Sequence, residues 1–236
     1  MNGLLVRVAS DQSEGGGYWN SPVDSLNNEF VYVAIPECRP NHAGMEKPYS
    51  SLTHNLAKMG ITLPRHLSSR TMHLDPDFSE LTYGDVGERA KQLQANLQSG
   101  DIIVFYSGLS DIRNKNSLVY AIIGFYVVQD IIFATSLPQS EWDINAHSRR
   151  ELKTEAKDVI VRANPESSGR LERCIKIGEY RDRAYRVTKE LLEEWGGLSV
   201  NDGYIQRSAR LPRFLDVELF LRWWKNQNPV LVHSNN

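Results

Sequence analysis

Cysteine is scarce in this sequence, and long apolar runs are missing from it. The 236 residues include two cysteines, Cys38 and Cys174, which give neither a disulfide framework nor the paired spacing of a zinc knuckle. No stretch approaches the ~18 uninterrupted apolar residues of a membrane span, and the N-terminus lacks the apolar segment and cleavage site of a secretory signal. We therefore expect two reduced thiols, no membrane association and a cytoplasmic location.

Several familiar catalytic and phosphate-binding patterns are also missing. No Gly-x-Ser-x-Gly elbow or Ser-His-Asp set stands out, and Cys38 lies in ECRP without a nearby base, which disfavours covalent hydrolysis. The glycines at 15–17 are followed neither by the Gly-Lys-Ser/Thr of a phosphate loop nor by the helix of a dinucleotide fingerprint.

The charge of the chain is nearly balanced but unevenly distributed. The formal net charge is -2, and 41% of the residues are hydrophobic, which excludes global disorder. Residues 1–101 carry eight basic and twelve acidic residues, whereas residues 149–189 carry twelve basic and seven acidic ones. The basic segment is either a surface that faces phosphate groups or an ordinary solvated face with mixed ion pairs.

Periodicity and turn residues predict an α+β chain. Strands are expected at 4–9 and 30–35, on either side of the glycine-rich loop. Helices are expected from Ser50 or Ser51 to Met59 and over 86–98, 189–195 and 217–224, and weaker strands over 158–162, 173–178 and 185–187. The apolar runs GDIIVFYSG (100–108) and 118–128 are separated by a polar turn, which predicts a buried antiparallel hairpin at the centre of the sheet.

The glycine-rich loop is the first candidate for chemistry. Asp11 ends the first strand, and Ser13, Glu14 and Gly15, Gly16 and Gly17 follow it. Glycines let backbone N–H groups approach a phosphate closely, and Asp11 can bind a metal or accept a proton. The alternative is a tight connection between two strands.

The second candidate is the segment HLDPD. In an extended backbone, alternation would place His73, Asp75 and Asp77 on one face, where an imidazole and two carboxylates can bind one divalent metal ion. Asp11 or His147 could complete the ligand set. The alternative is that Asp75 or Asp77 caps a helix or turn, since Asp-Pro-Asp is also favourable turn chemistry.

The third candidate combines aromatic and basic side chains. Aromatic faces stack on a splayed base and arginines hold phosphate, as in proteins that flip bases or bind single strands. The members are Tyr18, Trp19, Phe105, Tyr106 and Trp142 with Arg149, Arg150, Arg207, Arg210 and Arg213. Phe105 and Tyr106 are successive strand residues, so one of them faces a pocket, and we favour Tyr106. The alternative is that the aromatic residues form the core; Trp195, Trp223 and Trp224 are expected to pack helices.

The order of these motifs resembles two known groups. In the predicted hairpin, Gly-Asp opens the first strand and an aromatic residue ends it, and the next strand carries a glycine. This pattern is similar to the signature of PUA-like barrels, including the EVE, YTH and ASCH groups. The series SDQSEGGGYWNSPVD, AIPE, MHLDPDF, a helix and GDIIVFYSG resembles the third family of nucleotide modification associated domains. The similarity is good over 4–130 and looser over 131–236, where SARLPRF resembles the closing segment.

The resemblance implies one domain over 1–236, with a mixed or antiparallel β-barrel-like core, peripheral helices, and an association with modified DNA bases. We therefore expect a protein that binds a modified or flipped nucleotide, in DNA rather than RNA. Whether it also acts on that nucleotide stays open; if it is an enzyme, we expect metal-assisted or acid–base chemistry. Two alternatives stay open: a non-catalytic reader of modified nucleic acid, and an enzyme that acts on a free nucleotide. The sequence gives no indication of the oligomeric state.

Overall fold

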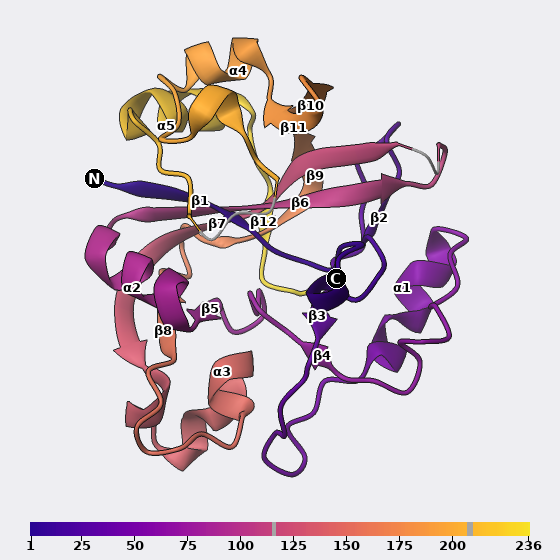
Figure 1. The fold of residues 1–236 in the computed structure, drawn as a ribbon, viewed down its shortest axis with the longest axis vertical. Coiled ribbons are helices and arrows are strands. Elements are labelled where there is room, and N and C mark those ends of the chain that lie inside the picture. The colour runs from indigo at the N-terminus through magenta and orange to yellow at the C-terminus, as the bar shows by residue number, and fades with distance from the viewer. Residues whose placement is uncertain (115–116, 207–209) are drawn as a thin grey trace.

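The predicted hairpin lies at the centre of the sheet. The computed structural model describes residues 1–114, 117–206 and 210–236, and Figure 1 shows their arrangement. Strands β6 (Ile102–Asp111) and β7 (Leu118–Phe133) pair in antiparallel fashion, with a register shift after Phe105. Both strands are largely buried because each carries apolar residues on both faces, which confirms the hairpin and its central place.

The sheet around the hairpin is mixed. It has eight strands, and its main path runs β1-β6-β7-β8-β5. Strands β1 (Gly3–Arg7) and β2 (Pro22–Val23) are parallel to β6. Strands β8 (Val159–Ala163) and β9 (Gly169–Lys176) are antiparallel to β7. Strand β5 (Thr82–Asp85) is antiparallel to β8, and β12 (Leu231–Val232) is antiparallel to β9. Within the described residues the strands do not close, so the expected barrel core is not confirmed, although the chain is a mixture of helices and strands as predicted.

Two further strand pairs and five α-helices complete the fold. The pairs are β3 (Ile35–Pro36) with β4 (Met72–His73), and β10 (Gly178–Arg181) with β11 (Ala184–Val187). The helices are α1 (Thr53–Lys58), α2 (Gly87–Asn96), α3 (Ala146–Arg149), α4 (Lys189–Glu194) and α5 (Val217–Asn226). Four of the helices were predicted near these bounds, whereas the short α3 was not. No described helix is long and apolar enough to cross a membrane.

The segment 30–35 differs from the prediction of a strand. Only its last residue belongs to β3, yet Tyr32 and Val33 are fully buried. Backbone groups of this segment bond to side chains: the Tyr32 N–H donates to the Asn236 side chain, and the Val33 N–H to the Ser21 hydroxyl. The β-branched and aromatic composition therefore reflects burial in the core rather than pairing in the sheet.

Apolar side chains fill both faces of the sheet. One cluster joins residues 30–34, α1 and α2 to alternate residues of β6 and β7. The other lies under α4 and α5, which Figure 1 shows above the strands, and it includes Trp195, Trp223 and Trp224. The prediction that these three tryptophans pack helices is confirmed.

Gly124 in β7 offers a test of this packing. A Cβ atom there would lie 2.3 Å from the Phe78 ring, which is itself in edge-to-face contact with Phe105 and Tyr126. Because the ring has no free space to move into, Gly124→Ala should lower the free energy of unfolding by about 1–3 kcal/mol in urea denaturation. In a Phe78→Leu background the same change should be much less destabilising. Equal losses in both backgrounds would show that the contact is not the cause.

Candidate functional site

A cavity of about 190 Å³ opens beside the N-terminal strand. Its walls come from the end of β1, the glycine-rich loop, the β3–β4 pair, β5 and the helices α2 and α3. The lining residues are Arg7, Val8, Ala9, Asp11, Ser13, Gly15, Gly16, Ile35, His73, Asp75, Tyr83, Gly84, Asp85, Arg89 and His147. The cavity thus joins segments that are far apart in the sequence, and it includes residues from two of the predicted motifs.

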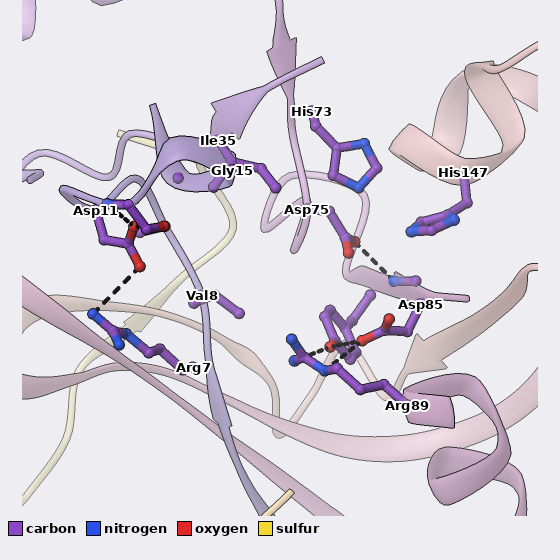
Figure 2. A pocket seen from close by; sticks show the side chains of 15 residues that line it. Arg7, Val8, Asp11, Gly15, Ile35, His73, Asp75, Asp85, Arg89 and His147 are labelled. Atoms are coloured by element: carbon purple, nitrogen blue, oxygen red, sulfur yellow. Dashed lines mark hydrogen bonds and ion pairs between the residues drawn. The ribbon is translucent and has the colours of Figure 1, made fainter. Parts of the chain in front are cut away.

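Two histidines and an aspartate converge on one side of this cavity. One potential ligand atom from each of His73, Asp75 and His147 lies within 4.8 Å of the others (Figure 2). The two imidazole rings meet edge to face, with centroids 4.9 Å apart. Two imidazole nitrogens and one carboxylate oxygen are a ligand set of catalytic zinc and non-haem iron sites, which keep a position open for water or substrate.

His73 is held in place by Glu37. The two side chains lie 2.8 Å apart through His73 Nδ1 and Glu37 Oε2, and Arg150 donates to the same carboxylate. Burial would raise the pKa of Glu37, but the hydrogen bonds from His73 and Arg150 outweigh it and lower the pKa to about 2. The carboxylate is therefore ionised and can only accept a hydrogen bond, which assigns a proton to Nδ1, although the Arg150 Nη2 donor also lies 3.0 Å from that atom. Burial also lowers the pKa of His73 to about 4, so its Nε2 keeps a free lone pair at neutral pH.

His147 has an equivalent partner in Asp158. Its Nδ1 lies 2.6 Å from Asp158 Oδ1, and both side chains are buried. Burial opposes ionisation of Asp158, yet the hydrogen bond from His147 and the charge of Arg150 leave its pKa below the ordinary value. Because each histidine uses Nδ1 for a carboxylate, the Nε2 atoms are left as the metal-binding atoms, an arrangement that metal-ligating histidines usually share.

Asp75 is positioned by a neighbouring strand and helix. The Gly84 N–H and the Asn145 side chain both donate to Asp75 Oδ1 at 2.8 Å, which leaves Oδ2 for a ligand within the described part of the chain. Asn145 also caps α3 by accepting the His147 N–H. A Cβ atom on Gly84 would lie 2.4 Å from the His147 ring, so glycine allows this close approach. Burial raises the pKa of Asp75 to about 6.

The opposite wall of the cavity carries two arginines. The Arg89 guanidinium donates to the Tyr83 hydroxyl at 2.9 Å and pairs with Asp85, and that hydroxyl donates to Asp85 at 2.6 Å. Arg7 forms a longer ion pair of 3.4 Å with Asp11 (Figure 2). A substrate in the cavity would therefore lie between the histidine–aspartate cluster and these polar groups.

Asp77 does not join its two motif neighbours. It is 2% exposed and lies outside the cavity, where it forms an ion pair of 2.6 Å with Arg149. Its other oxygen accepts the N–H groups of Ser79 and Glu80 and the side-chain amide of Asn235. The chain turns at Asp77 instead of continuing as a strand, so the alternation predicted for the motif ends at Asp75. The geometry brings His147 into the cluster in place of Asp77.

The glycine-rich loop forms a compact turn around Asp11. Its carboxylate accepts hydrogen bonds from the Ser13 N–H and hydroxyl, and a Cβ atom on Gly16 would overlap it. The N–H groups of Gly16 and Tyr18 donate to the Ser13 carbonyl, whereas Gly17 adopts a left-handed backbone conformation with φ 92°. Gly15 and Gly16 line the cavity and Gly17 does not. Asp11 lines the cavity but lies outside the histidine–aspartate cluster.

The candidate aromatic residues are dispersed. The Tyr106 side chain is buried against the α5 side of the sheet, and its hydroxyl donates to the Ile205 carbonyl at 2.7 Å. Phe105 lies in the opposite core. Trp19 packs partly buried against the same core, whereas Tyr18 is 62% exposed. Trp142 stacks on His42, also away from the cavity.

The candidate arginines have several different environments. Arg149 and Arg150 are buried in the ion pairs with Asp77 and Glu37, so they fix α3 to the core. Arg210 lines a small cavity beside Arg89 and Tyr106. Arg213 is exposed and reaches Asn96, and Arg207 lies outside the described residues.

Sequence reasoning did not identify several residues of the site. The missed residues are Glu37, Tyr83, Asp85, Arg89, Asn145 and Asp158. Glu37 lies in the quoted AIPE motif, but no spacing in the sequence connects it to His73, 36 residues away. Their importance follows from contacts made by the folded chain.

The fold and this site define a mixed α/β protein with a candidate metal centre next to a polar, partly cationic wall. The chain belongs to the family of nucleotide modification associated domain 3, whose model matches residues 2–214. The resemblance is therefore confirmed, and the match extends well beyond residue 130. Membership associates the chain with nucleotide modification. Searches of curated proteins and of solved structures found no match.

The pair of Glu37 and His73 gives the fold a specific acid sensitivity. The folded pKa of Glu37, about 2, is below its usual 4.5, so the unfolded chain binds more protons between these values. The stabilisation is complete above pH 4.5 and is lost as the pH falls toward 2. Glu37→Gln should therefore destabilise the metal-free protein by about 3 kcal/mol at pH 7 and by less than half as much at pH 3, measured by urea denaturation.

The exposed Glu29 provides the control for this measurement. Glu29→Gln should leave the free energy of unfolding near that of the wild type at both pH values. A loss in Glu37→Gln that is the same at pH 7 and pH 3 would contradict the assigned ionisation of Glu37.

Proposed function

We propose that this chain is a metal-dependent enzyme that modifies a nucleotide. The observation that carries the proposal is the cluster of His73, Asp75 and His147, in which each histidine is oriented by its own carboxylate. Such second partners are typical of metal-binding histidines. Membership of a family associated with nucleotide modification supplies the class of substrate.

The ligand set suits a divalent zinc or iron ion. His73 and His147 would each contribute Nε2, and Asp75 would contribute Oδ2. A metal ion held by three protein ligands supplies a site that polarises a substrate oxygen or activates a water molecule near neutral pH. The raised pKa of Asp75 belongs to the metal-free protein, because a nearby cation favours the ionised carboxylate.

The remaining walls are suited to hold the substrate. A cavity of about 150 Å³ accommodates one benzene molecule, so the 190 Å³ here is adequate for one aromatic ring of the size of a base. Tyr83, held by Asp85 and Arg89, presents a rigid polar edge to that ring. Arg7 lies beside the glycine-rich loop, where it can neutralise a phosphate group.

A non-catalytic reader receives less support from these contacts. Its predicted nucleic-acid contacts included Arg149, Arg150 and Tyr106, which are buried and form hydrogen bonds inside the protein. A reader also has no need for two carboxylate–histidine pairs that converge on one point. Both functions predict nucleotide binding, so dependence on metal separates them.

The test measures metal binding and metal-dependent chemistry together. Protein stripped with a chelator is titrated with Zn²⁺, and with Fe²⁺ under anaerobic conditions, in a calorimeter. The wild type should bind one ion, and Asp75→Asn should weaken this binding by roughly 100-fold or more, because it removes a charged ligand. Single-stranded oligonucleotides and nucleoside monophosphates are then incubated with each protein, and mass spectrometry detects a change in nucleotide mass that requires the metal.

Asp130→Asn is the matched control, because Asp130 pairs with Arg162 on the surface and does not line the cavity. This variant should bind metal and act as the wild type does. The enzyme would be rejected and the reader favoured by two results together. The wild type would bind no metal, and metal-free protein would bind nucleotide equally well with and without the Asp75→Asn substitution.

A further inference from the structure

A second cavity adjoins the first one. It has a volume of about 320 Å³ and shares Arg7, Asp11 and Ser13 with the first cavity. The two spaces are therefore neighbours on either side of the Arg7–Asp11 pair. None of the residues assigned above to metal binding lines the second cavity.

The second cavity has the chemistry of a base-binding pocket. Besides the shared residues, its walls carry the aromatic rings of Tyr120 and Tyr204 and the side-chain amides of Gln12, Asn20 and Gln206. Amide groups match the mixed donors and acceptors on the edge of a base, and the partly buried Tyr204 ring can stack on its face. Tyr120 is 2% exposed and closes the wall of the cavity.

Asn20 adds an independent sign of a ligand. The residue is 3% exposed, and its Nδ2 donates to the Gly108 carbonyl at 2.6 Å. Its Oδ1 is buried without a hydrogen-bond partner among the described residues. A buried acceptor of this kind usually has a partner, and an amino group of a base in the cavity would supply one.

Arg7 occupies the junction between the two cavities. Its guanidinium lies 5.5 Å from the centre of the Tyr120 ring and 3.4 Å from Asp11. That ion pair is longer than a charge-assisted hydrogen bond, which is usually ~2.7–2.9 Å. A phosphate at the junction would compete with Asp11 for the guanidinium. In a strand, the group that lies between two successive bases is a phosphodiester.

The β10–β11 hairpin supports the tyrosines of the second cavity. Tyr185 in β11 stacks on Tyr120 with ring centroids 4.3 Å apart, and Arg186 lies over the Tyr204 ring. This hairpin belongs to a basic region, because residues 176–189 contain five basic and two acidic side chains. Arg181 and Arg186 pair with Asp202, so a polyanion along the hairpin would meet the remaining charges of Lys176, Arg183 and Lys189.

We propose that the second cavity binds the base next to the nucleotide in the first cavity, so the protein acts on a nucleotide within a single strand rather than on a free one. The inference rests on the proposed function and specifies its substrate. The reacting nucleotide lies beside His73, Asp75 and His147, its neighbour lies against Tyr204, and Arg7 binds the phosphodiester that joins them.

The experiment compares one nucleotide with two. Calorimetry on metal-loaded protein measures the affinity for the 5′-phosphorylated homodinucleotides of A, C, G and T in deoxy form. The same measurement is made for the corresponding ribodinucleotides and for the matching 5′-monophosphates. At least one dinucleotide should bind about tenfold or more tightly than its monophosphate, the gain from one stacked base. The deoxy and ribo series distinguish DNA from RNA as the source of the strand.

Substitutions in the second cavity assign this gain. Tyr204→Ala should remove it and leave the affinity for the monophosphate and for metal unchanged, whereas Tyr204→Phe keeps the ring and should retain it. Phe133→Ala is the matched control, because Phe133 is an exposed aromatic residue of β7 that lines neither cavity. It should bind the dinucleotide as the wild type does.

The outcomes separate the two proposals. If monophosphates bind in a way that needs Asp75, but dinucleotides bind no more tightly, the strand inference is wrong and the proposed function stands. A gain that survives Tyr204→Ala places the second base elsewhere and also overturns the inference. If metal binds but neither class of nucleotide does, the proposed function itself is wrong.

Discussion

The hydrogen bond between a buried carboxylate and the Nδ1 atom of a histidine is the interaction on which this site depends. It occurs twice, between Glu37 and His73 and between Asp158 and His147. Each bond fixes the orientation of the ring and keeps the proton on Nδ1, so that Nε2 remains available on the side of the cavity. Without these partners, two adjacent buried imidazoles would have no defined tautomer, and a metal ion would have to order them as it bound.

The buried arginines are best understood through the same network. Arg150 donates to Glu37, and Arg149 pairs with Asp77 behind the cavity. Arg149 connects the short α3 helix to the loop that carries Asp75, and Arg150 connects the end of that helix to Glu37, the partner of His73. The two ion pairs therefore fix the positions of the proposed ligands relative to one another. Burying charge in this way stabilises a fold only when every partner is present. Arg149 and Arg150 therefore have structural roles although they lie near the candidate site. Arg7 differs from them because it lines both cavities and its ion pair with Asp11 is longer.

The sequence predicted the parts of this structure that local patterns determine. Four helices and the central hairpin follow from periodicity, caps and turn chemistry, and His73 and Asp75 of the predicted motif line one cavity. The segment 30–35 was mistaken for a strand because burial and sheet formation favour the same residues. Asp77 was placed with the ligands because alternation assumes an extended chain, whereas the chain turns there. Glu37, Asn145 and Asp158 could not be predicted, since their roles arise from contacts across many residues of sequence that tertiary packing creates.

The proposed function requires that His73, Asp75 and His147 form one metal centre. The test is anomalous X-ray scattering from crystals of the zinc-loaded protein, recorded on both sides of the zinc absorption edge. We expect one strong peak at ~2.0–2.2 Å from the Nε2 atoms of both histidines and from a carboxylate oxygen of Asp75. A peak at another site, or a site between the histidines with no zinc bound, would contradict it.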